Sequence, residues 1–162
     1  MTFPSLHGVK NRNGFTLMEL LIVIAILVIL MAVGFTNWMA QIKKGYDVRR
    51  KSDLSRLKIM LENYYNDRGC FPTYQNWIIQ ACGYPIFFMP SYPEKFPCDP
   101  ETKTRYVYEP ILNSAGDPCD GYRLFTKLKN PIDSDIQASG CGSGCGPGFQ
   151  YNYGVTSGVP IQ

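Results

Sequence analysis

Six cysteines, and one glutamate inside an apolar run, are the residues of this chain whose types and spacing could do chemistry. An even number of cysteines in a small, loop-rich region that follows an apolar segment is typical of disulfides formed in an oxidising compartment. We therefore predict that all six cysteines form disulfides. The preferred pairing is Cys70–Cys82, Cys98–Cys119 and Cys141–Cys145.

The same cysteines could instead bind zinc. Structural zinc sites usually take paired cysteines at short spacing, and this chain has no Cys-x-x-Cys motif; its only close pair is Cys141 and Cys145. We therefore predict no metal site. Four acidic residues that could be calcium ligands are spaced unlike a calcium loop and are interpreted as solvated loop acids. They are Asp117, Asp120, Asp133 and Asp135.

Catalysis is disfavoured by what the chain lacks. Its single histidine, His7, lies in the first 14 residues. A chain without that segment has no Ser–His or Cys–His dyad and no histidine general base. It also has no glycine-rich phosphate loop with its lysine, so nothing predicts nucleotide binding. We expect a protein that is not an enzyme and needs no cofactor.

The glutamate, Glu19, is the one charge in an apolar run from Phe15 to Ala40. At about 1.5 Å per residue a helix of this run is roughly 39 Å long, more than the ~30 Å hydrocarbon core of a membrane. The run predicts a single membrane span. A lone carboxylate at the centre of a span costs up to about 2.5–3.5 kcal/mol, so Glu19 requires a partner.

The partner could be created by proteolysis. Residues 1–14 are short and polar, carry Lys10 and Arg12 near their end, and finish on Gly14. A cut after Gly14 would give Phe15 a positive α-amine that can neutralise the Glu19 carboxylate of a neighbouring subunit. The trimmed chain would hold 14 basic and 13 acidic residues, since Lys10 and Arg12 leave the original 16 basic residues. Such a balance does not predict nucleic-acid binding.

The helix that would position these residues is predicted from the spacing of apolar side chains along the chain. Between residues 41 and 68 apolar side chains recur every three or four residues, as in Leu54, Leu57 and Leu61, which predicts an amphipathic helix half that packs on its own domain. Together with the apolar run it forms one helix from Phe15 to Asp67. The sequence Gly69-Cys-Phe-Pro72 predicts its end.

The remaining chain, residues 69–162, is predicted to form a small β-rich domain with an irregular tail after Asn130. Strand-like runs at Arg105–Tyr108 and Gly121–Leu128 flank a turn-rich segment, residues 113–118. They predict an antiparallel sheet of two or three strands that needs the helix to cover one face. The fold class is α+β, with disulfide-braced loops.

The segment Gly14-Phe-Thr-Leu-Met-Glu-Leu20 resembles the type IV prepilin signature. Looser similarities to pilins and secretion pseudopilins occur at residues 61–72, 99–100, 106–108 and 121–124. The resemblance implies that a prepilin peptidase cuts after Gly14 and methylates Phe15. It also implies a leader (1–14), a transmembrane and filament-core helix (15–40), an amphipathic half (41–68) and a pilin-like globular domain (69–162).

The function implied by this resemblance is that of a structural subunit, a homo-oligomer polymerised into a helical filament by an inner-membrane assembly platform and an assembly ATPase. The filament could be a type IV pilus or the pseudopilus of a type II secretion or DNA-uptake machine. The implied location is the inner membrane, single-pass, with the C-terminal domain outside the cytoplasm. In the assembled filament the domain is extracellular or periplasmic.

A second class of function is a membrane-anchored or secreted disulfide-bonded binding domain. An ordinary secretory signal could end at Ala32-Val-Gly34, but Glu19 would then interrupt its apolar core without a reason. Basic residues beyond the apolar run outnumber those before it, which by charge alone favours the opposite orientation. We give more weight to the cysteines, and expect these cations to face lipid head groups or neighbouring helices. They are Lys43, Lys44, Arg49, Arg50 and Lys51.

The N-terminus of the mature protein tests this interpretation. Mass spectrometry of the N-terminal peptide should find a chain that begins at Phe15, with a methylated amine. A chain that begins at Phe35 would instead indicate an ordinary signal peptide and would remove the main support for a filament subunit.

Overall fold

The computed structural model describes residues 14–90 and 92–161, except for the side chains of residues 33–37 and 40. The predicted leader therefore lies outside the described residues, apart from Gly14. The chain divides into two units, Met1–Ala40 and Gln41–Gln162, and each is described by itself below.

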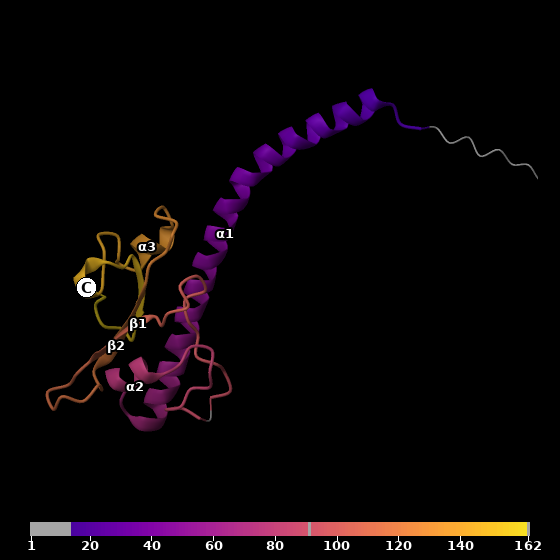
Figure 1. Ribbon diagram of the computed structural model, residues 1–162. Coiled ribbons are helices and arrows are strands. Elements are labelled where there is room, and N and C mark those ends of the chain that lie inside the picture. The colour runs from indigo at the N-terminus through magenta and orange to yellow at the C-terminus, as the bar shows by residue number, and fades with distance from the viewer. Residues whose placement is uncertain (1–13, 91, 162) are drawn as a thin grey trace, which may run out of the picture. The chain divides into compact units, whose positions relative to one another are not determined.

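A single helix, α1 (Leu17–Arg68), accounts for 52 residues and confirms the predicted long N-terminal helix (Figure 1). It ends where the sequence predicted. Gly69 adopts a positive φ of 75°, and its N–H donates to the carbonyl of Tyr65 at 2.7 Å. Glycine reaches this left-handed conformation without the steric cost that a side chain would add.

Among the residues that the structure describes, no helix is long and apolar enough to cross a membrane. The predicted span from Phe15 to Ala40 is therefore not confirmed by the structure. Part of that prediction concerns the side chains of residues 33–37 and 40, which lie outside the described part of the chain.

Three antiparallel strands form the sheet of the second unit: β1 (Val107–Ile111), β2 (Gly121–Thr126) and β3 (Tyr153–Thr156). Their order is β1-β2-β3, with Tyr108 opposite Leu124 in one pair and Leu124 opposite Val155 in the other. The first two strands overlap the predicted runs, but β1 begins later than predicted and continues to Ile111, and β2 ends at Thr126. The third was not predicted, because the segment after Asn130 shows no alternation of apolar and polar residues.

Gly154 explains why β3 was missed. Glycine normally argues against a strand interior, yet a Cβ atom at Gly154 would lie 2.6 Å from the carbonyl oxygen of Leu124. The residue that weakens the sequence signal is therefore the one that lets β3 approach β2 closely.

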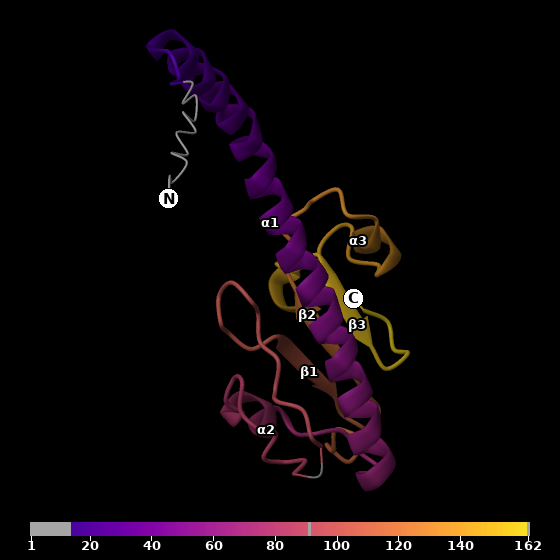
Figure 2. The same cartoon turned by 90° about the vertical axis from the view of Figure 1, so that its right-hand side faces the viewer.

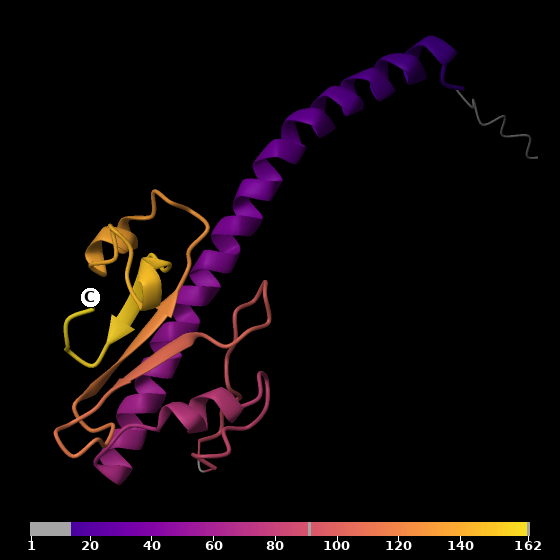
Figure 3. The same cartoon turned by 60° about the vertical axis from the view of Figure 1, so that its left-hand side comes forward.

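The core of the second unit lies between the sheet and the amphipathic half of α1 (Figures 2 and 3). The predicted apolar stripe is confirmed, because Leu54, Leu57 and Leu61 are fully buried. They pack in one cluster with three tyrosines and a leucine of the sheet region. These are Tyr106, Tyr108, Tyr122 and Leu124.

Two short helices were not predicted from the sequence: α2 (Tyr74–Ile79), and α3 (Ser134–Ala138), which lies in the tail predicted to be irregular. Each is started by a side-chain cap, from Thr73 and Asp133 respectively. Helices this short give too few turns for a periodic pattern, so tertiary contacts decide them. In α2, Trp77 donates its indole N–H to the carbonyl of Tyr106 at 2.9 Å.

All six cysteines are in disulfides, as predicted, but two of the three predicted pairings are wrong. The structure joins Cys70 to Cys119, with Cα atoms 4.1 Å apart, and Cys82 to Cys98, 5.7 Å apart. The predicted pair Cys141–Cys145 is confirmed.

Backbone pairing between distant segments explains the correction. The N–H of Phe71 donates to the carbonyl of Pro118 at 2.7 Å, which brings the β1–β2 loop to the end of α1. Phe96 pairs with Gly83 and Tyr84 through two hydrogen bonds of 2.9 Å, which sets Cys82 beside Cys98. The sequence-based prediction could not include these contacts.

Candidate functional site

The start of α1 is built by a reciprocal pair of hydrogen bonds between Thr16 and Glu19. The Glu19 N–H donates to the Thr16 hydroxyl oxygen at 3.2 Å, and the Thr16 N–H donates to a Glu19 carboxylate oxygen at 3.4 Å. This is a capping box, in which each side chain satisfies a backbone N–H that the helix cannot. The motif residue Glu19 therefore also fixes where the helix begins.

Glu19 is exposed, and none of the ion pairs found among the described residues involves it. The first turn of a helix favours an anion modestly, because the free N–H groups carry partial positive charge. Within one described copy the carboxylate thus has a cap partner and a favourable dipole, but no cation within ion-pair distance.

Gly14 and Phe15 lie immediately before the helix, in exposed, non-helical backbone. A Cβ atom at Gly14 would meet no heavy atom within 4 Å. The bond between the two residues is therefore open to another molecule. That a peptidase cuts it stays a prediction.

The first turns of α1 expose apolar side chains on every side. From Phe15 to Met31 the large apolar side chains are between 46% and 84% exposed, with Leu27 lowest and Phe15 highest. A helix that is apolar all round needs a covering of lipid or of other helices. Contiguous apolar surface of this extent marks a site of interaction.

The second unit contains a buried cation, Arg50, which is 1% exposed. Its guanidinium donates to Asp99 at 2.6 Å, to Asp47 at 2.9 Å and to Glu101 at 2.8 Å. The prediction that Arg50 faces lipid or a neighbouring helix is therefore wrong. A buried guanidinium needs carboxylates that neutralise its charge. The segment after Cys98 supplies two of the carboxylates that Arg50 contacts, those of Asp99 and Glu101.

The contacts of Lys51 contradict the prediction that it faces lipid head groups or a neighbouring helix. They also bear on the predicted solvated loop acids. The Lys51 ammonium group lies 3.1 Å from an Asp133 carboxylate oxygen and 2.7 Å from one of Asp135. Asp133 is thus a largely buried ion-pair partner instead of a solvated loop acid, whereas Asp135 is paired but keeps 48% of its side chain exposed. Asp117 and Asp120 are exposed, as predicted. No group of three potential metal ligands occurs within residues 14–90 and 92–161.

Asp47 extends the network to the C-terminal segment. Besides its pair with Arg50, its carboxylate accepts the backbone N–H groups of Lys129 and Asn130, both at 2.8 Å. The spacing of Asp47 and Arg50, three residues apart in a helix, was a signal that could have indicated their contact. Nothing in the sequence indicated the contacts to Asp99 or to the backbone near Asn130.

The network shifts the pKa values of its members. Burial alone would lower the pKa of the Arg50 guanidinium, but hydrogen bonds to Asp99, Glu101 and Asp47 raise it above its ordinary value. Burial alone would raise the pKa of Asp99, but hydrogen bonds from Arg50 and from the N–H groups of Thr102 and Glu101 lower it to about 2. Both groups are therefore held in their charged forms.

Comparison with known proteins gives one finding. Residues 9–35 match the family described as the prokaryotic N-terminal methylation motif, the signature of type IV pilins and pseudopilins. The match contains Gly14, Phe15 and Glu19 and confirms the resemblance drawn from the sequence. No curated protein and no solved structure matches the chain.

The depressed pKa of Asp99 predicts an acid-sensitive contribution to stability. Because the folded-state pKa, about 2, lies below the unfolded value of about 3.9, the contribution is present above about pH 4 and is lost as the pH falls through about 2. Asp99→Asn should lower the free energy of unfolding at pH 7. Between pH 4 and 2 it should also flatten the dependence on pH.

Urea unfolding of the full chain in a non-ionic detergent measures both effects, followed by the change in tryptophan fluorescence as buried Trp77 becomes exposed, with already exposed Trp38 as a background signal. Other acids, including Asp53, whose pKa is raised by burial, are present in both proteins. The difference between the two curves therefore reports Asp99. Parallel curves across this pH range would show that the Arg50–Asp99 pair does not stabilise the fold.

Proposed function

We propose that this protein is a structural subunit of a type IV pilus or pseudopilus. It is cut after Gly14 by a prepilin peptidase, held in the inner membrane by the apolar part of α1, and polymerised into a helical filament. The observation that carries the proposal is the apolar, exposed start of α1 within the methylation motif.

The exposed apolar side chains need two coverings in turn. Before assembly, lipid covers the segment that begins at Phe15; after assembly, the same segments of neighbouring copies cover one another. Lipid tails and apolar side chains are alike as solvents, so transfer from one to the other costs little and packing decides the outcome. The domain formed by residues 41–162 then forms the outside of the filament.

Electrostatics sets the register between copies. Cleavage creates a positive amine on Phe15, and a copy inserted next to another brings that amine towards an exposed Glu19. Each buried charge needs an opposite charge nearby, so the pair favours one axial position over others. The presence of Glu19 favours a subunit of the filament core over a subunit of the filament tip.

The proposed role is non-enzymatic. Its partners are other copies of the chain, the prepilin peptidase, an inner-membrane assembly platform and a separate assembly ATPase. The C-terminal domain lies outside the cytoplasm, and the disulfides support an oxidising environment. Long filaments in sheared cell-surface material would indicate a pilus, and their absence a pseudopilus.

Substitutions at Glu19 test the electrostatic part. Glu19→Ala removes both the charge and the capping box, whereas Glu19→Gln keeps the capping box and removes only the charge. Both should accumulate in the membrane and reduce the filament fraction strongly, since an unmatched buried charge costs about 3–5 kcal/mol per subunit. Glu19→Asp should be intermediate, because its charge has a shorter reach.

The measurement compares membrane and filament fractions for each variant, with Asp67→Ala as the control for loss of an exposed acid outside the motif. Assembly by Glu19→Gln at the unmodified level would show that Glu19 serves only as a helix cap. Assembly by both Glu19→Ala and Glu19→Gln would overturn the proposed core mechanism.

A further inference from the structure

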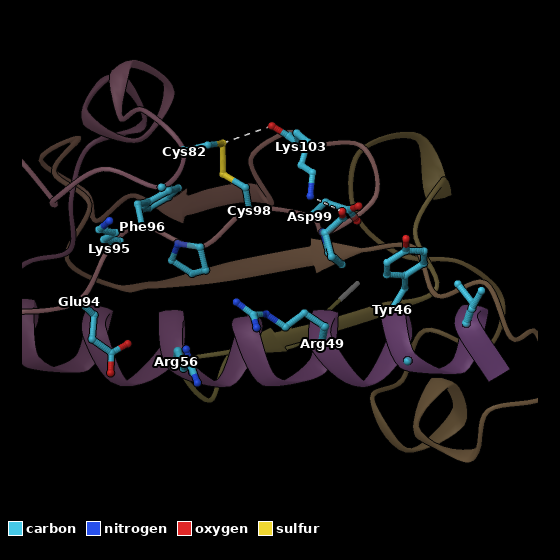
Figure 4. A pocket seen from close by; sticks show the side chains of 15 residues that line it. Tyr46, Arg49, Arg56, Cys82, Glu94, Lys95, Phe96, Cys98, Asp99 and Lys103 are labelled. Atoms are coloured by element: carbon cyan, nitrogen blue, oxygen red, sulfur yellow. Dashed lines mark hydrogen bonds between the residues drawn. A yellow bond between two sulfur atoms is a disulfide. The ribbon is translucent and has the colours of Figure 1, made fainter.

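An open groove of about 1200 Å³ runs along α1 in the second unit (Figure 4). One wall is the helix from Ile42 to Arg56, and the other is the segment from Cys82 to Lys103, braced by the Cys82–Cys98 disulfide. Ile42, which is 39% exposed, and Tyr46 contribute apolar surface to it. No part of the described chain fills this space.

Four of the residues that line the groove are cations: Arg49, Arg56, Lys95 and Lys103. Arg56 and Lys95 are exposed and belong to none of the ion pairs found among the described residues. Arg49 pairs with Asp53 but keeps 60% of its side chain exposed. Two acids, Glu94 and Asp99, also line the groove. Glu94 is exposed, whereas Arg50 already neutralises Asp99. The cations outnumber the acids, so the lining is positive on balance and would take an acidic ligand.

The same unit carries an exposed acidic surface, the β1–β2 loop at residues 112–120. Asp117 and Asp120 are exposed there, and neither belongs to an ion pair within the described part of the chain. The loop contains no lysine or arginine. At its base Leu112 is 55% exposed, so the loop combines negative charge with an apolar side chain.

The loop is held in shape before it meets a partner. The Asn113 side-chain oxygen accepts the N–H groups of Ala115 and Asp117, both at 2.9 Å. The disulfide between Cys70 and Cys119 ties its far side to the end of α1. A preorganised loop loses little conformational freedom on binding, which favours its use as a ligand.

The loop cannot enter the groove of its own chain. The helical wall of the groove stops at Arg56, whereas the loop is fixed beside the residues that follow Arg68. Twelve helical residues separate these positions, a distance of about 18 Å along the axis. Figure 3 shows the β1–β2 loop near this end of α1.

We propose that the groove binds the acidic β1–β2 loop of a second copy of this chain. Because the groove and the β1–β2 loop lie at different levels along α1 within one unit, the contact between two copies is head-to-tail. Head-to-tail contacts that do not close into a ring produce open helical polymers. The proposal rests on the proposed function in placing this contact within the filament, between the domains that cover its core.

An anionic lipid head group would also suit a positive groove. The second copy is the better fit because the chain itself supplies a rigid loop whose two carboxylates and apolar base match the mixed lining of the groove. Charge complementarity of this kind fixes register and partner choice more than it adds affinity.

Photo-crosslinking tests the contact in the full chain in its own membrane. A benzoylphenylalanine in place of exposed Ser114 should crosslink one copy to another, and mass spectrometry should find the linked peptides within residues 42–56 or 82–103. The double variant Arg56→Glu, Lys95→Glu should lower the crosslink yield by about tenfold, because like charges then face each other.

Reversing the loop as well, with Asp117→Lys and Asp120→Lys, should restore the yield. The control variant is Lys58→Glu, Lys127→Glu, which reverses two exposed cations outside the groove and should leave the yield unchanged. Loss of yield in this control, or failure of the combined variant to restore it, would overturn the proposal.

The outcomes separate this proposal from the proposed function. Filaments with crosslinks elsewhere would overturn the loop–groove contact and leave the filament subunit intact. Crosslinks to the groove without any filament would support the contact and overturn the filament. Absence of both would overturn both. Crosslinks to lipid instead of protein that are lost on charge reversal of the groove would overturn the loop–groove contact and assign the groove to a membrane surface.

Discussion

The need to cover an apolar helix on all its sides is the constraint on which the rest of this structure depends. Backbone groups inside a helix satisfy one another, but the large apolar side chains from Phe15 to Met31 are exposed within one described copy. Water cannot cover them at a tolerable cost, since each buried methylene gains about 0.8 kcal/mol. A covering of lipid or of other helices would meet this need, and the proposed function uses the two in turn.

The second unit, Gln41–Gln162, has a different requirement. It must stay folded whether lipid or other helices cover the apolar part of α1. Its part of α1 uses one face for the apolar core and the adjacent positions for buried polar contacts, such as that of Arg50 with Asp99. The Cys70–Cys119 disulfide joins the end of the helix to the sheet region. Ionic contacts at one level of the helix and a covalent bond at another thus hold the sheet against it.

Much of this organisation could be predicted from the sequence, because it follows from local periodicity. The long helix, the buried stripe around Leu57 and two strands belong to this class. The disulfide pairing, β3 and the role of Arg50 do not, since each depends on residues about 50 positions apart or on close backbone approach. At the motif, the sequence identified Glu19 as a charge that needs a partner, but not its capping box with Thr16.

The most direct test of the central claim is helical reconstruction by electron cryo-microscopy of filaments sheared from the cell surface or assembled from the purified machinery. The account predicts a core of packed helices formed by the segment that begins at Phe15. It also places each Glu19 carboxylate within about 4 Å of the Phe15 amine of a neighbouring copy. A filament whose core excludes this segment, or a protein that stays single in the membrane when the machinery is complete, would contradict the account.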